Sequence, residues 1–388
     1  MPVDEAFRRT ALPDRLLGLT RRRPGLPLLS SYPAGELAAL LVQAGGTASQ
    51  ARATSIKVLR HVYRGPPTPT RWCVETLQSL GIGAWAEAAL LGLDATLSLT
   101  IRERALADDG SARLLLATRD GNLLETVLIP SRDRTTLCVS SQVGCSRACA
   151  FCETGRIGLT RQLDAGEIVD QVRLAAAVWD ERTPRISNIV FMGMGEPFDN
   201  LGEVAKATDL LTDHNAFALR KSAITVSTVG VADKLETFWS TCHAELAVSL
   251  NAPTDTQRLR LMPINERFPL DVLFAELRRT LPKGRKILFE YVLMRDVNDS
   301  DTDAAALAER VREVPCRVNV IPANPGPDAA LSAPSPDVVD RFVATLVRLG
   351  VTTLVRRPRG RDVGGACGQL AAARRAASVS ATLPAETG

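Results

Sequence analysis

Three cysteines near the middle of this chain of 388 residues have a spacing suited to a metal cluster. Cys145, Cys149 and Cys152 form the pattern C-x3-C-x2-C, and Phe151 directly precedes the third cysteine. Thiolates at this spacing can converge on one iron–sulfur cube and leave its fourth iron open to another ligand. The alternative is a zinc knuckle, but zinc sites usually take a fourth Cys or His nearby, and none follows closely. The pattern therefore favours an iron–sulfur site with one open iron.

Polar residues and glycines follow several of the strand-like segments. Functional residues of barrels gather at the carboxyl ends of strands, because those loops share one face. A carboxylate such as Glu196 can hold an ammonium group there, and a neighbouring glycine lets the backbone approach a ligand closely. Each residue taken singly is equally well explained as a turn or cap residue. Together they predict a ligand-binding rim made of Gly195, Glu196, Ser227, Ser249, Leu250, Asn251 and Asn324.

The second half of the chain has to position these residues, and in it apolar strand-like runs alternate with helical ones. Six such pairs in order, with apolar strands, predict an α/β fold with a parallel sheet curled toward a barrel. Because eight units are needed to close a barrel, we expect a partial (β/α)6 barrel. The expected strands are 136–144, 186–193, 223–230, 245–253, 286–294 and 317–325, followed by 352–358, and the expected helices are 167–179, 201–213, 231–239, 269–281, 301–314 and 336–350.

The first third of the chain has a different organisation. Residues 1–30 carry arginine clusters among prolines and glycines and are predicted to form a flexible basic arm, and residues 31–96 are predicted to form a small helical accessory domain. Its third helix is expected over 74–91. A short β-meander is expected at 97–130, with turns at Asp109-Gly110 and Asp120-Gly121. The barrel is assigned to 131–370, and 371–388 are predicted to be a disordered tail.

Composition limits the class of protein. Hydrophobic residues make up 45% and charged residues 23% of the chain, which is typical of a soluble globular protein. No apolar run is long enough for a membrane span, and the first residues lack the apolar core of a secretory signal, so a cytoplasmic protein is expected. In a reducing compartment, clustered thiols indicate metal binding or thiol chemistry. The net charge of +4 permits a nucleic-acid partner without requiring one.

The cysteine pattern on a partial barrel, with Gly195-Glu196-Pro197 after the second strand, resembles the radical S-adenosylmethionine superfamily. The resemblance implies one [4Fe-4S] cluster held by Cys145, Cys149 and Cys152. It also implies that the open iron binds the amino and carboxylate groups of S-adenosylmethionine, with the rim residues completing its site. An electron from the cluster then cleaves the sulfonium to a 5′-deoxyadenosyl radical.

Two further phrases narrow the resemblance to the RlmN/Cfr family of rRNA adenine C-methyltransferases: TLCVSSQVGC, with Cys138, and ACGQL, with Cys367. The likeness runs from about 125 to 370, and the helical domain at 31–96 before it is compatible with the accessory RNA-binding domain of that family. It implies that Cys367 accepts a methyl group from one S-adenosylmethionine and that a radical from a second activates this methyl for addition to adenine. Cys138 then attacks the sulfur of Cys367, which releases the RNA and leaves a transient disulfide. Glu125 matches the family's proton acceptor and is equally well explained as a solvated strand residue.

The resemblance implies 23S rRNA as the partner, with tRNA as a further candidate and a flavodoxin-type or other reductant, and with neither DNA nor membrane as a partner. Basic residues near the expected site suit phosphate contacts, although most arginine runs are simply solvated. The arginines concerned are Arg156, Arg161, Arg356, Arg357, Arg359 and Arg361.

The chain departs from the family pattern at Asn251, where His is common, and at Gly364-Gly365, which puts substrate and rate in doubt. Phrases such as GRIGL and MPINERFPLD resemble the Cfr branch as much as the RlmN branch. Methylation at C2 of adenine is the first choice and C8 the alternative. Two other functions stay open: a radical enzyme acting on a substrate other than RNA, and a non-catalytic iron–sulfur protein that binds RNA or senses redox state.

Overall fold

A partial barrel forms the centre of the computed structural model, which describes residues 26–64, 73–179, 184–326, 328 and 330–371. Within these residues one sheet has ten strands in the order β1-β2-β3-β4-β7-β8-β9-β10-β11-β12. Strands from β4 onward pair in parallel, whereas β1 to β4 pair antiparallel. The barrel strands are β4 (Thr135–Cys138), β7 (Ile186–Phe191), β8 (Ile224–Thr228), β9 (Glu245–Ser249), β10 (Ile287–Leu293), β11 (Cys316–Pro322) and β12 (Thr353–Val355).

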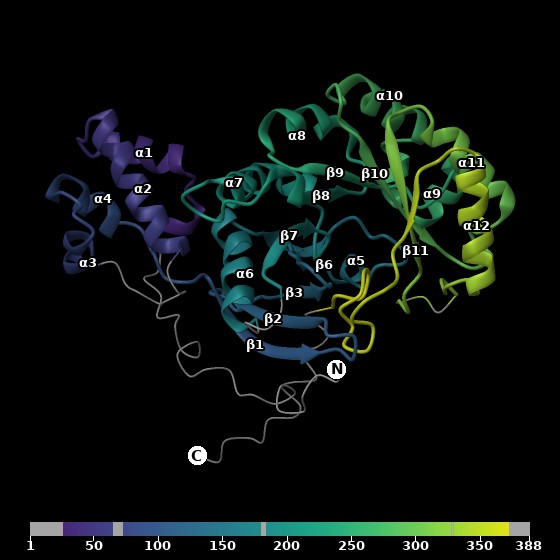
Figure 1. Ribbon diagram of the computed structural model, residues 1–388, viewed down its shortest axis with the longest axis horizontal. Helices are drawn as coiled ribbons and strands as arrows, with labels where there is room; N and C mark the ends of the chain where they lie inside the picture. Colours follow the sequence, from purple (N-terminus) through teal and green to yellow (C-terminus); the bar gives the residue numbers. More distant parts are fainter. Residues whose placement is uncertain (1–25, 65–72, 180–183, 327, 329, 372–388) are drawn as a thin grey trace, which may run out of the picture.

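Helices cover the outer face of this sheet (Figure 1). They are α6 (Ala165–Val178), α7 (Leu201–Thr212), α8 (Leu235–Thr241), α9 (Asp255–Leu261), α10 (Leu270–Thr280), α11 (Asp301–Val311) and α12 (Pro336–Arg348). The predicted partial barrel is therefore confirmed. Each strand places alternate residues on opposite faces. On β10, Phe289 stacks on Phe274 of α10, and Tyr291 stacks on Phe342 of α12, so Glu290 between them faces the inside of the barrel.

The expected first barrel strand, 136–144, divides into two segments. β4 ends at Cys138, and β5 (Gln142–Cys145) leaves the main sheet to pair antiparallel with β6 (Gly158–Gln162). The chain turns between them because Ser141 and Gln142 both donate their backbone N–H to the carbonyl of Met194. β5 and β6 therefore form a separate two-stranded ribbon, and β5 ends at Cys145, the first predicted cluster ligand.

Four helices precede the sheet and lie beside α6 and α7: α1 (Ala34–Gln43), α2 (Ala48–Arg64), α3 (Val74–Ser79) and α4 (Glu87–Leu91) (Figure 1). The prediction of one helix over 74–91 is wrong. Gly81 has a left-handed φ of 62° that ends α3, because it takes the chain out of the helical region. The helices have their own core and contact the barrel through Tyr63, which packs on Phe217, and through Ser31, whose hydroxyl accepts from Gly166 N–H.

Three antiparallel strands extend the barrel sheet at the β4 edge: β1 (Leu99–Leu106), β2 (Ala112–Thr118) and β3 (Leu123–Pro130). The turns lie where the sequence placed them, since Gly110 and Gly121 adopt φ values of 81° and 84°. β3 pairs with β4, and the hydroxyl of Thr126 donates to the carbonyl of Cys138 at 2.6 Å. The extension therefore supports the strand that carries one of the predicted reactive cysteines.

Some expectations lie outside the described residues. These are most of the basic arm and the tail after residue 371. Across the described ranges, no helix combines the length and apolarity that a membrane crossing requires.

Candidate active site

A cavity opens at the carboxyl ends of the barrel strands, with an empty volume of about 930 Å³ that includes its mouth. Its wall brings together residues from β5, the loop after β5 and the ends of β7, β8, β9 and β10. The C-terminal segment that follows β12 closes one side. Predicted site residues on this wall are Cys145, Cys149, Cys152, Gly195, Glu196, Ser227, Ser249, Asn251 and Cys367.

The three predicted cluster ligands converge on one part of the cavity. Cys145 ends β5, Cys149 lies in the following loop, and Cys152 caps α5 (Glu153–Ile157). Burial raises the pKa of Cys145 to about 12. Burial also raises the pKa of Cys149, and the nearby sulfurs of Cys152 and Cys145 raise it further. Buried thiols of this kind lose their protons when iron takes the sulfur as a thiolate ligand.

The donor set fits a cubane cluster better than a single ion. Ligands of one zinc ion stand around a common centre at about 2.3 Å, whereas each thiolate of a cubane holds a different corner iron. Within the described ranges, no three His, Cys, Asp or Glu side chains come close enough together to hold a single metal ion. The three cysteines that share one cavity wall therefore suit three corners of a cubane.

Glu196 is a buried carboxylate on the same wall. One oxygen accepts from Phe198 N–H at 2.9 Å, the other accepts from Val229 N–H at 2.8 Å, and the Glu196 N–H donates to Gln142 Oε1 at 2.7 Å. Gly195 before it has a φ of 103°, and a Cβ there would stand 2.5 Å from the Cβ of Gln142. The backbone can therefore pack closely only with glycine. Burial raises the pKa of Glu196 to about 7 despite these N–H donors.

This pKa predicts a pH dependence for binding of S-adenosylmethionine. The carboxylate attracts the ligand's ammonium only when ionised, so affinity should fall about tenfold per pH unit below about 7 and stay level just above it. Equilibrium dialysis of the ligand against anaerobic protein measures this. Glu196→Gln should bind weakly at every pH, while the exposed control Glu236→Gln should keep the wild-type profile. A sloping profile in Glu196→Gln would assign the titration to another group.

The remaining rim residues divide into two groups. Ser227, Ser249 and Asn251 line the cavity. Leu250 does not, because its side chain is fully buried and its N–H donates to the carbonyl of Glu290. Asn251 has a φ of 58°, and its amide is engaged by Val292 N–H and by the sulfur of Met262. Its side chain therefore fixes the bend after β9.

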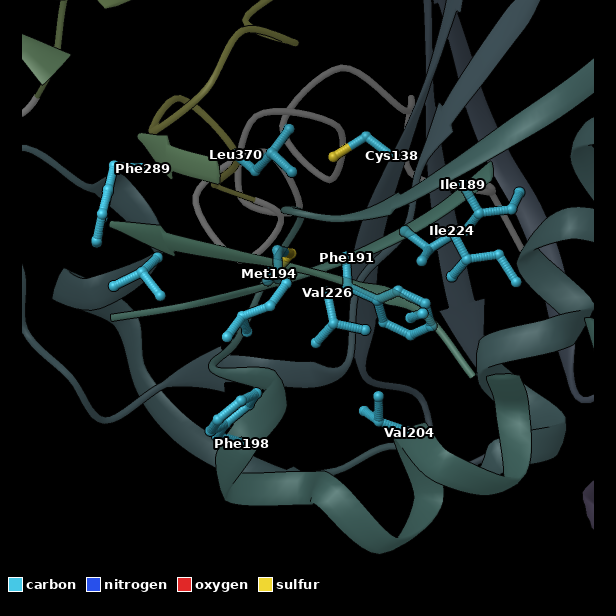
Figure 2. Packing of buried hydrophobic residues seen from close by; sticks show 14 of the residues in the cluster. Cys138, Ile189, Phe191, Met194, Phe198, Val204, Ile224, Val226, Phe289 and Leu370 are labelled. Atoms are coloured by element: carbon cyan, nitrogen blue, oxygen red, sulfur yellow. The ribbon is translucent and has the colours of Figure 1, made fainter. Parts of the chain in front are cut away.

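A second, smaller pocket adjoins the cavity, and it brings the two remaining predicted cysteines together. We call it the thiol pocket; its wall includes Cys138, Met192, Asn324, Arg356, Arg359, Cys367 and Leu370. Cys138 is buried at the end of β4, and its sulfur points toward Leu370 in Figure 2. Cys367 lines both spaces, so it faces the cluster cysteines on one side and Cys138 on the other.

Contacts on both sides hold the loop that carries Cys367. Asn324, which lies off the main cavity wall, donates its amide to the carbonyl of Cys367 at 3.1 Å and accepts from Arg361 at 2.8 Å. Gly368 has a φ of 81°, and a Cβ there would stand 3.0 Å from the carbonyl of Phe151. Its own carbonyl accepts from Glu153 N–H. The Cys367 loop and the cluster loop are therefore packed backbone against backbone.

Glu125 lies behind this loop and does not line the cavity. Its side chain is fully buried; one oxygen binds Arg113 at 2.6 Å, and the other accepts from Ala371 N–H at 2.7 Å. Arg113 in turn donates to the carbonyl of Val363 at 2.8 Å. Arg113 and Glu125 thus hydrogen-bond to the chain before and after Cys367, at Val363 and Ala371. This geometry favours a positioning role over the predicted role as proton acceptor, and it excludes the solvated strand residue.

Most of the basic residues predicted to contact RNA are bound within the chain. Arg359 pairs with Asp109 at 2.9 Å, and Arg361 binds Asn324. Arg161 bridges Asp120 and Glu167, both at 2.7 Å. Arg357 and Arg156 are exposed, whereas Arg356 is half-buried in the thiol pocket. The four arginines that are close in sequence therefore differ in the structure. Arg359 and Arg361 bind other parts of the chain, Arg357 is exposed, and Arg356 lines the thiol pocket.

Sequence reasoning missed three charged residues near the site. Arg147 and Glu290 line the cavity. Arg258 is a fully buried cation that donates to the carbonyls of Val229 and Leu250 and interacts electrostatically with Cys149. Glu290 had one signal, since a carboxylate inside an apolar strand rarely occurs without a role. The other two lie outside any strand pattern.

Known proteins similar to this chain agree with the geometry. The model of the radical SAM superfamily matches residues 139–308. A probable RNA methyltransferase of Sorangium cellulosum is 60% identical over 88% of this chain and 87% of its own length. A dual-specificity RNA methyltransferase RlmN of Anaeromyxobacter dehalogenans is 45% identical over 71% of this chain and 76% of its own.

Among solved structures, a radical SAM methyltransferase from Sphaerobacter thermophilus superposes with a TM-score of 0.77 at 38% identity, covering 89% of this chain and 99% of its own. Identity at this level across most of both chains, together with the three cysteines and the strand-end rim, places the chain in one family. This protein belongs to the RlmN/Cfr family of radical S-adenosylmethionine enzymes.

Proposed function

We propose that this RNA methyltransferase places a methyl group on C2 of an adenine in 23S rRNA, with tRNA as a second substrate, and that Cys367 carries the methyl group. One observation supports this most strongly. Cys367 lines the cavity of the cluster cysteines and also the pocket of Cys138. A carrier that must first be activated by a radical and then released by a thiol needs access to both.

The target atom explains why a carrier is needed. The amidine carbons of adenine, C2 and C8, are electron-poor, so neither attacks a methyl sulfonium directly. When bound, S-adenosylmethionine and the cluster supply the methyl group and the radical that activates it. A carbon radical on a methyl group held by sulfur can add to such a position. A cysteine at the junction of two pockets suits this chemistry.

The protein's own groups then complete the reaction. Once the methylene carbon has bonded to the ring, the ring hydrogen would leave as a proton and the unpaired electron would return to the bound cluster that supplied it. Cys367 then holds the one-carbon unit as a thioether, so RNA is joined to the enzyme through this carbon. Cys138 attacks the sulfur of Cys367; the sulfur–sulfur bond forms, the carbon–sulfur bond breaks, and its electron pair remains on the carbon, which takes up a proton to become methyl. A dithiol reductant must then open the disulfide, and a flavodoxin-type protein is our candidate electron donor for the cluster.

The choice of C2 and of 23S rRNA follows from the family resemblance of the sequence, and a second RNA substrate is suggested by the name of a relative. The A. dehalogenans protein is named a dual-specificity RNA methyltransferase RlmN, which supports two kinds of RNA substrate. Arg357 is exposed near the site, where its guanidinium can contact RNA phosphates. Because phosphate contacts carry little sequence information, they would orient the RNA without selecting the base. The base must leave its stack to enter the cavity.

Nucleoside mass spectrometry of rRNA and tRNA from cells with and without the gene tests this function. We expect 2-methyladenosine in both RNA fractions only when the gene is present, and its loss when Cys367→Ser replaces the wild type. Cys316→Ser is a matched control, because this cysteine begins β11 and the cavity lies at the carboxyl ends of the barrel strands. Finding 8-methyladenosine would move the assignment to C8. Unchanged RNA in all strains would overturn RNA methylation at adenine carbon.

A further inference from the structure

Arg356 is the basic residue that the proposed function leaves unexplained. It follows β12, and its backbone N–H donates to the carbonyl of Val320, which directs the side chain into the thiol pocket. There its Nη1 lies 3.5 Å from the sulfur of Met192, a weak acceptor. A half-buried guanidinium in such a place is costly unless its charge is used.

The neighbours of Arg359 and Arg361 differ from those of Arg356. Arg359, on the same pocket wall, is neutralised by Asp109, and Arg361 donates to Asn324. Over the ranges that the structure describes, Arg356 makes no ion pair with a carboxylate and donates from its guanidinium only to Met192. Its positive charge is therefore not cancelled by a direct carboxylate partner.

The charges that Arg356 does face come from three elements. Cys138 lies at the end of β4, Cys367 lies on the C-terminal loop, and Glu290 lies on β10. Glu290 accepts two hydrogen bonds from the amide of Asn319, at 3.0 and 3.2 Å, which hold it against β11. The two thiols share the pocket with Arg356 itself.

Cys138 needs such a neighbour. Burial, with a smaller contribution from Cys367, raises the pKa of Cys138 to about 12, although Arg356 acts in the opposite direction. The thiolate is the nucleophile in thiol–disulfide chemistry, and an adjacent arginine is one of the features that favour it. Even with this cation present, the thiolate fraction near neutral pH is very small, and loss of the cation would reduce it further.

We propose that Arg356 is a positioning residue for the release step, in which its guanidinium stabilises negative charge on the sulfur of Cys138 as this sulfur attacks Cys367. The proposal rests on the proposed function. It also orders the steps, because Cys367 is a thioether and no longer a thiol once it carries carbon. From then on the guanidinium faces Cys138 as the only ionisable thiol of the pocket, which activates the attacking sulfur at the stage when release is required.

The first test needs no radical chemistry. The rate at which iodoacetamide alkylates Cys138 is measured against pH by peptide mass spectrometry, on cluster-loaded full-length protein without S-adenosylmethionine. In Arg356→Gln the midpoint of this profile should rise by about one pH unit or more, as expected for losing an adjacent arginine. Arg356→Lys should restore most of the shift, and Arg357→Gln, which changes the exposed neighbouring arginine, should match wild type. An unchanged midpoint in Arg356→Gln would overturn the proposal.

The second test follows the covalent protein–RNA adduct on denaturing gels. Arg356→Gln should accumulate an RNase-sensitive adduct that survives roughly tenfold longer than in wild type near neutral pH, and raising the pH should shorten its life. Wild-type release rates in Arg356→Gln would contradict the proposal. If wild-type protein carries no methyl group on Cys367 at all, the proposed function fails, while the alkylation profile still decides the role of Arg356.

Discussion

Replacing Cys149 by alanine is expected to remove the cluster and with it all radical chemistry. Two remaining thiolates hold only two corners of a cubane. Cys367 is the other described cysteine on the cavity wall, and its loop is held in place by the hydrogen bond from Asn324. Because groups that act as a unit fail together, formation of 5′-deoxyadenosine should fall by roughly a thousandfold or more. Iron and sulfide content, the visible absorption of the cluster and deoxyadenosine formation measure the loss.

Cys242→Ala is the matched control. This cysteine is also buried, but it ends α8 at the opposite end of the barrel from the cavity. We expect full iron content and normal deoxyadenosine formation in this variant. If Cys149→Ala retained the cluster absorption, ligation by the C-x3-C-x2-C motif would have to be abandoned.

Replacing Cys138 by alanine should trap the enzyme on its RNA. The one-carbon unit on Cys367 still joins the adenine, but the sulfur that breaks the carbon–sulfur bond is gone. Turnover should then stop after about one event per enzyme, and a covalent protein–RNA species should accumulate. Denaturing gels with and without RNase, followed by mass spectrometry of the peptide containing Cys367, identify it.

Two variants sharpen this result. Cys138→Ala combined with Cys367→Ala should give no adduct, because the carrier is absent. Cys316→Ala, which removes a half-buried thiol on β11, should turn over normally. A Cys138→Ala protein that forms methylated RNA in multiple turnovers would rule out Cys138 as the releasing thiol.

Cys138 and Cys367 are held in place in different ways. Burial keeps the thiol of Cys138 protonated, whereas Cys367 lies on a loop that Glu125, Arg113 and Asn324 hold in place. The antiparallel strands β1 to β3 supply two of these three residues. The extension of the sheet thus supports the candidate site, because it holds the loop of Cys367, the proposed methyl carrier.

Local sequence determined much of this protein. The cluster motif spans a few residues, so its spacing alone brings three sulfurs near one another, and alternation of apolar residues located each barrel strand within a few positions. Glycines marked the turns at Gly110 and Gly121, because few other residues adopt those φ values readily. The splitting of 136–144 into β4 and β5 was not visible, since both halves are apolar and the turn depends on the distant carbonyl of Met194.

Tertiary structure alone decided the roles of the charged residues. Sequence presented Arg356, Arg357, Arg359 and Arg361 as one basic run, but Asp109 and Asn324 neutralise or hold two of them, and the fold turns Arg356 toward Cys138. Likewise Glu125 could not be placed until Arg113 and Ala371 were seen beside it. The physical reason is that a side chain's charge and pKa depend on which distant groups share its low-dielectric surroundings, and sequence spacing does not record those neighbours.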